Sequence, residues 1–214
     1  MSTLVTDDTP ALGPDEPAGD GRKLRRERNR MAVVDALLDL YDQGNLRPSS
    51  TEVAEQAGLS PRSLFRYFDD TDDLCRTAVD RALERARPLL PIGAGPDDPL
   101  PDRVAALVEQ RLRLFPAVAA AATVSRLESP FQPALAARLR SNRAHLRDQL
   151  RALFAPELRA MAPARADAVL AAADVLTSFE AHQLLRDDQH LSSPGAAAAV
   201  EGALLALFGQ TTQG

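Results

Sequence analysis

The sequence has little sulfur and few aromatic side chains: its 214 residues include one cysteine, no tryptophan, two tyrosines and seven phenylalanines. A single cysteine, Cys75, excludes an internal disulfide and every site built on several thiolates, such as a zinc finger or an iron–sulfur cluster. The sequence also has no run of about 18 apolar residues and no basic-then-apolar pattern near its first residue. We therefore expect a cytoplasmic protein that has no membrane partner.

Sequence motifs of the common enzyme classes are absent as well. There is no phosphate-binding glycine pattern, no nucleophile elbow and no histidine with an obvious catalytic partner. His182, Asp187, Asp188 and His190 are of metal-ligand type, but their spacing matches no metal motif. We therefore expect no enzymatic activity, no cofactor and no metal site.

Charge is distributed unevenly along the chain. The first twenty residues carry acidic side chains and no Lys or Arg, which accounts for the whole formal net charge of −5. Because this segment has too few apolar residues to offset the entropy of ordering, we expect residues 1–21 to form a disordered acidic tail. A dense basic run follows. It consists of Arg22, Lys23, Arg25, Arg26, Arg28 and Arg30 and is interrupted by Glu27. The run is either the solvated start of a helix or part of a nucleic-acid-binding surface.

Apolar residues recur at three- and four-residue steps over most of the chain, which predicts an all-α protein of about nine helices. Gly44, Gly58 and several prolines supply the stops, and the stretch 88–101, rich in Pro and Gly, is expected to be a boundary or a long loop. Ser50 or Thr51 is the expected N-cap of the second helix. The predicted helices span residues 23–43, 50–57, 60–68, 70–87, 102–114, 117–127, 133–154, 164–188 and 194–208.

Residues 49–68, SSTEVAEQAGLSPRSLFRYF, form the most informative segment. Two short helices joined by a tight turn need a small residue at the crossing, a turn glycine and an apolar lock, roles that Ala54, Gly58 and Leu64 fill. This spacing indicates a DNA-binding helix-turn-helix, although short paired helices also occur as plain packing units. Ser60 is the expected cap of the later of these two short helices, residues 60–68. The expected buried face of that helix consists of Leu64, Phe65 and Phe68.

Over residues 28–81 the chain resembles the TetR family of bacterial transcriptional regulators. The matching segments are LLDLYDQG, STEVAEQAGLS, PRSLFRYF and a capped fourth helix that carries Leu74. The resemblance implies a three-helix DNA-binding unit followed by a variable helical domain that binds a small-molecule effector and dimerises. Two positions depart from the family pattern, because many members have tyrosine at Phe65 and most have lysine at Thr71, both of which usually contact phosphate. The expected division is an acidic tail (1–21), a helix-turn-helix domain (22–70) and an effector-binding and dimerisation domain (71–214).

The resemblance implies which side chains contact DNA. Those expected to face the major groove, with Thr51 near the DNA backbone, are Ser60, Arg62, Ser63, Arg66 and Tyr67. Because arginine forms bidentate hydrogen bonds with guanine, we expect Arg62 and Arg66 to recognise sequence. The residues of the basic run expected to reach phosphates or the adjacent minor groove are Arg22, Lys23, Arg25, Arg26 and Arg30.

Two further surfaces are expected in the second domain. The residues expected to line an effector pocket are Leu107, Arg111, Phe115, Phe131 and Phe179. Arg111 falls in line with apolar residues, so its side chain either extends to water, which we favour, or faces the pocket. The expected dimer interface, for which an ordinary intramolecular core is the alternative, consists of Val169, Ala172, Ala173, Leu176, Leu204, Leu205 and Phe208.

These features predict a ligand-responsive repressor that binds a near-palindromic operator in double-stranded DNA as a homodimer and responds to a small-molecule effector. The alternative is a small-molecule-binding or protein-interaction module whose DNA-binding unit has degenerated. The departures at Phe65 and Thr71 favour that alternative, because each phosphate contact contributes to DNA affinity.

Overall fold

The computed structural model describes residues 18–209, and within this range it contains helices and no strand, which confirms the predicted all-α class. The α-helices span, in chain order, α1 (Ala18–Asp42), α2 (Ser50–Gln56), α3 (Pro61–Leu64), α4 (Thr71–Ala86), α5 (Leu100–Glu128), α6 (Pro133–Leu153), α7 (Ala155–Ala160), α8 (Pro163–Leu176), α9 (Phe179–Gln183) and α10 (Ser193–Gly209). The 3₁₀-helix η1 (Arg87–Leu89) follows α4, and the π-helix η2 (Leu184–Asp188) follows α9. Residues 1–17 of the predicted acidic tail lie outside the described residues, whereas α1 already begins at Ala18.

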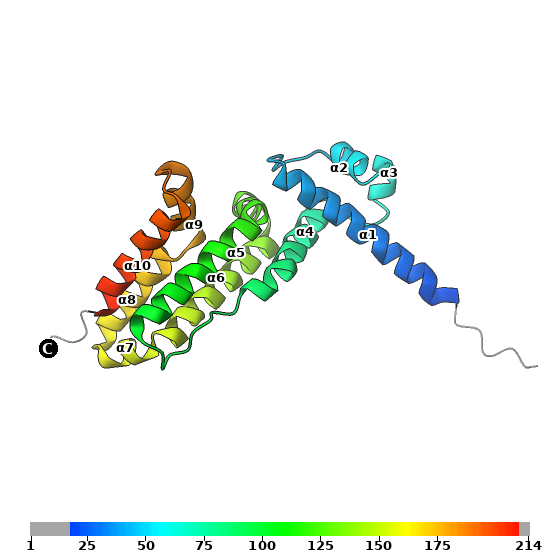
Figure 1. The fold of residues 1–214 in the computed structure, drawn as a ribbon. Helices are drawn as coiled ribbons and strands as arrows, with labels where there is room; N and C mark the ends of the chain where they lie inside the picture. Colours follow the sequence, from blue (N-terminus) through cyan, green and yellow to red (C-terminus); the bar gives the residue numbers. More distant parts are fainter. Residues whose placement is uncertain (1–17, 210–214) are drawn as a thin grey trace, which may run out of the picture.

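The helices form an elongated molecule with two distinct ends (Figure 1). α1, α2 and α3 lie at one end, α4 leads away from them, and α5–α10 form a bundle at the other end. α5 is the central helix of this arrangement, since it packs against α4, α6 and α10. No helix within residues 18–209 combines the length and apolar character needed to cross a bilayer.

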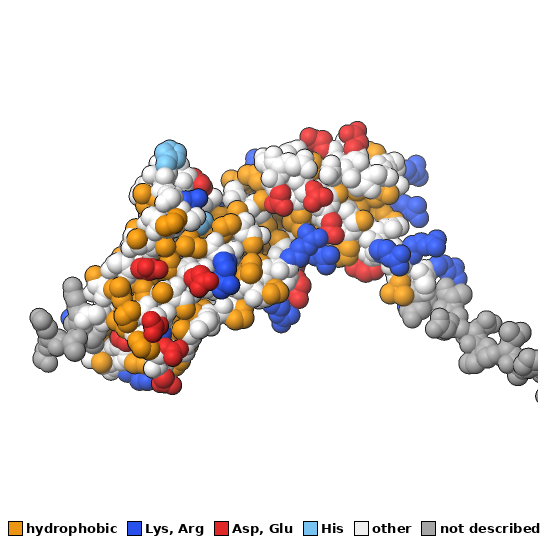
Figure 2. All heavy atoms as spheres, in the orientation of Figure 1, with side chains coloured by type: hydrophobic (Ala, Val, Ile, Leu, Met, Phe, Trp, Pro, Cys, Tyr) orange, Lys and Arg blue, Asp and Glu red, His pale blue; other side chains and the backbone are white. Residues whose placement is uncertain are grey.

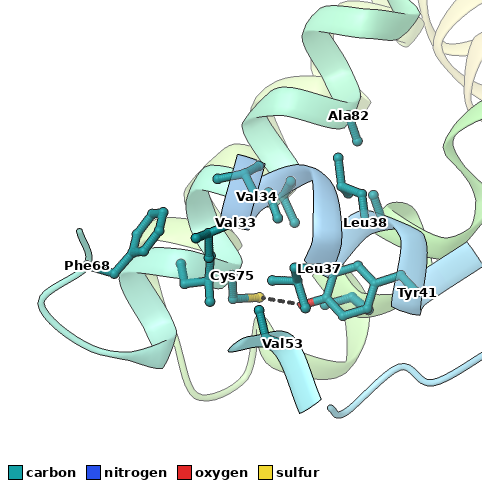
Figure 3. Close-up of a cluster of buried hydrophobic side chains, with 14 of the residues drawn as sticks. Val33, Val34, Leu37, Leu38, Tyr41, Val53, Phe68, Cys75 and Ala82 are labelled. Carbon is teal, nitrogen blue, oxygen red and sulfur yellow. Dashed lines mark hydrogen bonds between the residues drawn. The ribbon is translucent and has the colours of Figure 1, made fainter. Parts of the chain in front are cut away.

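A buried apolar cluster joins the first four helices (Figure 3). Its members include Val33, Val34, Leu37, Leu38 and Tyr41 of α1, Val53 of α2, Leu64 of α3, Phe68, and Leu74, Cys75 and Ala82 of α4. Within it the Tyr41 hydroxyl donates a hydrogen bond to Cys75 Sγ at 3.6 Å. Burial raises the pKa of both groups, so Cys75 stays a protonated thiol of low reactivity. The cluster continues to Val124 of α5 and Leu135 of α6, which packs the first unit onto the bundle.

Glycines and capping side chains set the ends of α1 and α2. Gly44 and Gly58 follow these helices with φ of +88° and +67°, a conformation that glycine adopts without strain. The N-cap of α2 is Ser49, one residue before the expected position. Its hydroxyl accepts a hydrogen bond from Glu52 N, and the Glu52 carboxylate accepts one from Ser49 N. This capping box needs a glutamate three residues after the cap, which selects Ser49 over its neighbours.

Three predicted features of the chain from α5 to α9 differ in the structure. α5 runs unbroken through Pro116, because one proline removes a single intrahelical hydrogen bond and three neighbouring helices hold α5 in place. α7 occupies the segment after Phe154 that was expected to be a break. The predicted helix 164–188 is interrupted, because the Ser178 hydroxyl accepts a hydrogen bond from Ala181 N at 3.1 Å and starts α9. The described residues therefore form ten α-helices rather than about nine.

A second apolar cluster holds α5, α6, α8 and α10 together. In it the rings of Phe154 and Phe208 stack with their centroids 4.1 Å apart. Four residues that were expected at a dimer interface belong to this cluster and are buried against helices of the same chain. They are Val169, Ala173, Leu204 and Phe208. Their burial corresponds to the intramolecular alternative, so a partner surface on α8 and α10 has to be built mainly from other side chains.

Candidate nucleic-acid interface and ligand cavity

The segment around α3 begins as the sequence predicted. The Ser60 hydroxyl accepts a hydrogen bond from Ser63 N at 3.3 Å and caps the helix, and Pro61 occupies the first helical position. Regular helix ends at Leu64, and turns carry the chain on to Phe68. We refer to residues 60–68 as the α3 segment.

Side chains of the α3 segment divide between core and solvent. Leu64 and Phe68 are buried in the cluster that α1 and α4 share. The expectation that Phe65 is buried is wrong, because 49% of it is exposed. Leu64 and Phe68 are one helical turn apart, and a residue next to Leu64 is rotated by about 100° from it. The polar side chains that stay wholly or partly exposed are Ser60, Arg62, Ser63, Arg66 and Tyr67, while Thr51 is exposed on the first turn of α2.

Two side chains of α1 contact the α3 segment. Arg26 Nη2 donates a hydrogen bond to Arg66 O at 3.4 Å, and Asn29 Nδ2 donates one to the Tyr67 hydroxyl at 3.2 Å. The basic run and the α3 segment therefore form one surface, which we call the basic end. Its cationic residues are Arg22, Lys23, Arg25, Arg26, Arg28, Arg30, Arg62 and Arg66. Figure 2 shows Lys and Arg side chains gathered over α1 and α3, at the end of the molecule far from α8 and α10.

Several groups of the protein hold the side chain of Arg30. Its Nη2 donates a hydrogen bond to Thr77 Oγ1 at 3.0 Å, and its guanidinium carbon lies 4.7 Å from the centroid of the Phe68 ring. Glu27 lies 3.8 Å from its other terminal nitrogen. These contacts fasten α1 to α4 and to the α3 segment, so Arg30 helps to fix the geometry of the basic end.

A cavity of about 20 Å³ lies between α5, the junction of α8 with α9, and α10. Its wall is mainly apolar, and its polar lining residues are Arg111, Thr177, Ser178 and His182. Two of the five residues expected in a pocket, Arg111 and Phe115, line it, and Phe179 packs edge-on against Phe115 with ring centroids 5.7 Å apart. The other two do not line it, since Leu107 lies in the second apolar cluster and Phe131 is 74% exposed.

The polar groups of this cavity have unusual surroundings. The expectation that Arg111 extends to water is wrong, because only 4% of it is exposed. Burial lowers the pKa of Arg111 to about 10, which leaves the guanidinium charged at neutral pH. Burial also lowers the pKa of His182, with Arg186 acting in the same direction and Asp187 opposing.

Among residues 18–209, no group of three His, Cys, Asp or Glu side chains could hold a metal ion.

Sequence reasoning missed the cavity residues Thr177, Ser178 and His182, because it predicted one continuous helix there. The Thr177-Ser178 pair is the signal that was available, since a hydroxyl N-cap with an acid in the first turn after it is typical of a helix start. Here the acid is Glu180 in the first turn of α9.

An apolar surface runs along α8 and α10 at the end of the molecule opposite the basic end (Figure 2). Its groove includes Ala172, Val175, Leu176, Ala203 and Leu207, and we call this surface the α8–α10 face. Val175 is 67% exposed there, although it is a large apolar residue. Of the residues expected at a dimer interface, Ala172, Leu176 and the largely buried Val169 line the groove, and Leu205 is exposed on α10.

Comparison with known sequences finds one short match. No family model matches the chain. An HTH-type transcriptional regulator of Haemophilus influenzae is 36% identical over 63 residues, which are 28% of this chain and 31% of that protein. The match therefore spans less than a third of the relative's length, and the rest of the relative says nothing about this chain.

Comparison with solved structures extends over most of the chain. A TetR-family transcriptional regulator from Streptomyces coelicolor aligns with a TM-score of 0.68 and 19% identity, over 86% of this chain and 82% of that one. A TetR-like transcriptional regulator from Rhodococcus sp. RHA1 aligns with a TM-score of 0.58 and 21% identity, over 88% of this chain and 97% of that one. The multidrug binding protein EbrR, whose structure was solved in complex with imidazole, aligns with a TM-score of 0.59 and 20% identity, over 84% of this chain and 94% of that one. The chain thus has the fold of TetR-family transcriptional regulators, as its sequence resemblance predicted.

Proposed function

We propose that the protein is a transcriptional regulator that binds double-stranded DNA as a homodimer and changes its DNA affinity when a small molecule occupies the bundle. The observation that carries this proposal is the basic end. There two exposed arginines, Arg62 and Arg66, lie beside the basic run of α1, in a fold that TetR-family regulators share.

The basic end has the chemistry that DNA recognition requires. Arg62 and Arg66 offer planar forks for bidentate hydrogen bonds to guanine, and the partly exposed Ser63 and Tyr67 offer groups for phosphates or bases. The cations of α1 add the sequence-independent attraction to phosphates that dominates affinity. Contacts between α1 and the α3 segment hold the two parts in one orientation, so both engage the same stretch of DNA.

The α8–α10 face supports a homodimer. It is apolar, it lies far from the basic end, and its small residues allow two helix pairs to approach closely. A two-fold axis through this face would leave both basic ends free. Two copies would then contact two half-sites, which predicts a near-palindromic operator.

α4 connects the cavity to the DNA-binding unit. At its C-terminal end Ala86 packs in one buried cluster with Phe115, which lines the cavity. Nearer its start, Leu74 and Cys75 lie in the cluster of α1, α2 and α3. A ligand that favours one position of α4 therefore changes the spacing of the two basic ends, and a ligand with equal affinity for both positions changes nothing. Repression that the ligand relieves is the regulatory outcome we propose.

One observation favours the second candidate, a ligand-binding or interaction module without specific DNA binding. Phe65 and Thr71, the two positions that depart from the TetR pattern, are both exposed at the basic end or next to it. Their side chains lack the phenol and the ammonium group that usually contact phosphate in the family.

Selection of DNA fragments separates the two candidates. Purified protein is mixed with sheared DNA of the source genome near physiological salt, and the bound fragments are sequenced. Enrichment of a near-palindromic motif supports the regulator. Recovery without any enriched motif contradicts it and favours the module without specific DNA binding.

A further inference from the structure

Two arginines of α5 are equally buried but differ in how their charge is balanced. Arg103 and Arg111 are each 4% exposed. Arg103 donates hydrogen bonds to both carboxylate oxygens of Glu157, one of them at 2.9 Å, and a further one to Leu153 O at 2.8 Å. Arg111 has no acidic residue within salt-bridge distance among residues 18–209.

The partners of Arg111 are all uncharged. Its Nη1 donates hydrogen bonds to the side-chain oxygens of Gln110 and Gln149, the second at 2.9 Å, and its Nη2 donates a long one of 3.3 Å to Leu146 O. Its Nε has no partner. Asp174 is the acidic side chain whose charge acts on Arg111, but Arg147 already binds that carboxylate at 2.6 Å. A buried cation without a counter-ion is costly, so this position is one where an anion would be strongly stabilised.

The other residues that line the cavity indicate which chemical groups such an anion would have besides its negative charge. Arg111 lines the cavity between α5, the α8–α9 junction and α10, whose wall is otherwise mainly apolar. The Ser178 hydroxyl and His182 add two groups able to form hydrogen bonds. At about 20 Å³ the cavity has room for one water molecule, so a larger occupant has to displace part of the wall. The wall at α9 and η2 is the part built from short, irregular helices.

We propose that this cavity binds a small monocarboxylate with an apolar body, whose carboxylate forms a bidentate ion pair with Nε and Nη2 of Arg111. This inference rests on the proposed function, because it assigns the chemical class of the effector. Arg111 is thereby the residue that selects a negatively charged ligand. The ligand carboxylate neutralises Arg111 as the carboxylate of Glu157 neutralises Arg103. The edge of the guanidinium formed by Nε and Nη2 is the one that carries only the long bond to Leu146 O.

The partners of Arg111 link this site to α4. Gln110 Nε2 donates hydrogen bonds to Leu89 O at 2.8 Å and Leu90 O at 3.3 Å, and Gln149 Nε2 donates one to Leu90 O at 2.8 Å. Leu89 and Leu90 follow closely on the C-terminal end of α4. A carboxylate that draws the guanidinium toward itself weakens the bonds from Arg111 to both glutamines. The two glutamines then no longer fix the end of α4, which gives the ligand a route to the DNA-binding unit.

Paired probes test the requirement for negative charge. Hexanoate and phenylacetate are titrated calorimetrically into the full chain without DNA, alongside hexanamide and phenylacetamide, which have nearly the same shape and no charge. We expect at least one carboxylate to bind at least about tenfold more tightly than its amide, the range for a hydrogen bond to a charged group. Equal affinity within each pair, or no binding of either carboxylate, would overturn the proposal.

Variants of the chain test the role of Arg111. We expect Arg111→Met to lose the preference for the carboxylate over the amide. Gln149→Glu gives the guanidinium an internal carboxylate while Gln110 still donates to Leu90 O, and we expect it to lose the preference as well. Arg113→Met removes an exposed arginine from the same helix and should leave both affinities unchanged. Retention of the preference in folded Arg111→Met or Gln149→Glu protein would contradict the assignment.

The titrations contain no DNA, so their outcome is independent of the proposed regulator function. A chain that prefers carboxylates but enriches no DNA motif would contradict the regulator and leave the ligand assignment standing. A chain that enriches a motif but shows no carboxylate preference would overturn the ligand assignment alone.

Discussion

Asn29 of α1 donates a hydrogen bond of 3.2 Å to the hydroxyl of Tyr67, just beyond α3. The contact joins two segments 38 residues apart in the chain, the basic run and the segment that carries Arg62 and Arg66. It ties the turn of α1 that follows Arg28 to the α3 segment. Non-specific attraction to phosphate and contact with base edges therefore reside in one unit.

This arrangement predicts how DNA affinity depends on salt. Replacing Lys23, Arg25 and Arg28 together by Gln should flatten the plot of log affinity against log salt, by about 0.9 for each phosphate that the protein no longer neutralises. Fluorescence anisotropy with a selected DNA fragment measures the slope. The matched control replaces three exposed arginines of the bundle by Gln, Arg113, Arg140 and Arg159, and should leave the slope unchanged. Equal slopes in all three proteins would show that α1 makes no phosphate contact.

The α8–α10 face makes a prediction about assembly. Val175 is 67% exposed on it, so Val175→Glu should leave the fold intact and convert a dimer into a monomer, because two carboxylates would be buried against an apolar surface. Size-exclusion chromatography with light scattering measures the mass. Phe131→Glu makes the same kind of change at a side chain that is 74% exposed near the start of α6, and should leave the dimer intact. A monomeric wild-type chain, or a Val175→Glu variant that stays dimeric, would contradict this role of the face.

The DNA-binding unit could be predicted from the sequence because its determinants are local. Gly58, Ser60 and Pro61 set the turn and the start of α3 within a few residues of one another, and the structure places them as expected. Phe65 was misplaced because its apolar character was read as burial, although a residue next to the buried Leu64 is rotated by about 100° from it.

The surroundings of the cavity depend on contacts that no local pattern contains. Arg111 was expected to reach water because a long charged side chain usually does. Its buried guanidinium instead donates a hydrogen bond to the side chain of Gln149, 38 residues away on α6. The break before α9 likewise follows from a single hydroxyl cap, which competes weakly with a continuous apolar pattern.

The buried pair of Arg103 and Glu157 predicts a large loss of stability on removal of one partner. Glu157→Gln leaves the buried guanidinium of Arg103 without the carboxylate that now binds it and should lower the free energy of unfolding by about 3–5 kcal/mol. Chemical denaturation followed by circular dichroism measures the change. Glu84→Gln removes the partner of exposed Arg87, 3.3 Å away, and should cost less than about 1 kcal/mol. Similar losses in the two variants would argue against a special role for the buried pair.

Glu180 predicts a dependence of stability on pH. Burial disfavours its charge, but hydrogen bonds from Arg126, at 3.0 Å, and from Arg143 outweigh that effect and lower the pKa of Glu180 to about 2. A depressed pKa in the folded state stabilises the protein above the ordinary pKa of glutamate, and this contribution is lost as the pH falls toward the folded value. Glu180→Gln should therefore be less stable than wild type at pH 7, and the difference should vanish between about pH 4.5 and 2. A difference that is constant over this range would contradict the pairing.

The proposed recognition of a DNA sequence by Arg62 and Arg66 is tested by repeating the selection of genomic fragments with the double variant Arg62→Ala/Arg66→Ala. An Arg140→Ala variant, altered at an exposed arginine of α6, serves as the matched control. We expect wild type and the control to enrich the same near-palindromic motif and the double variant to lose it, since each bidentate contact is worth about 1–3 kcal/mol. Enrichment of the same motif by the double variant would contradict the account.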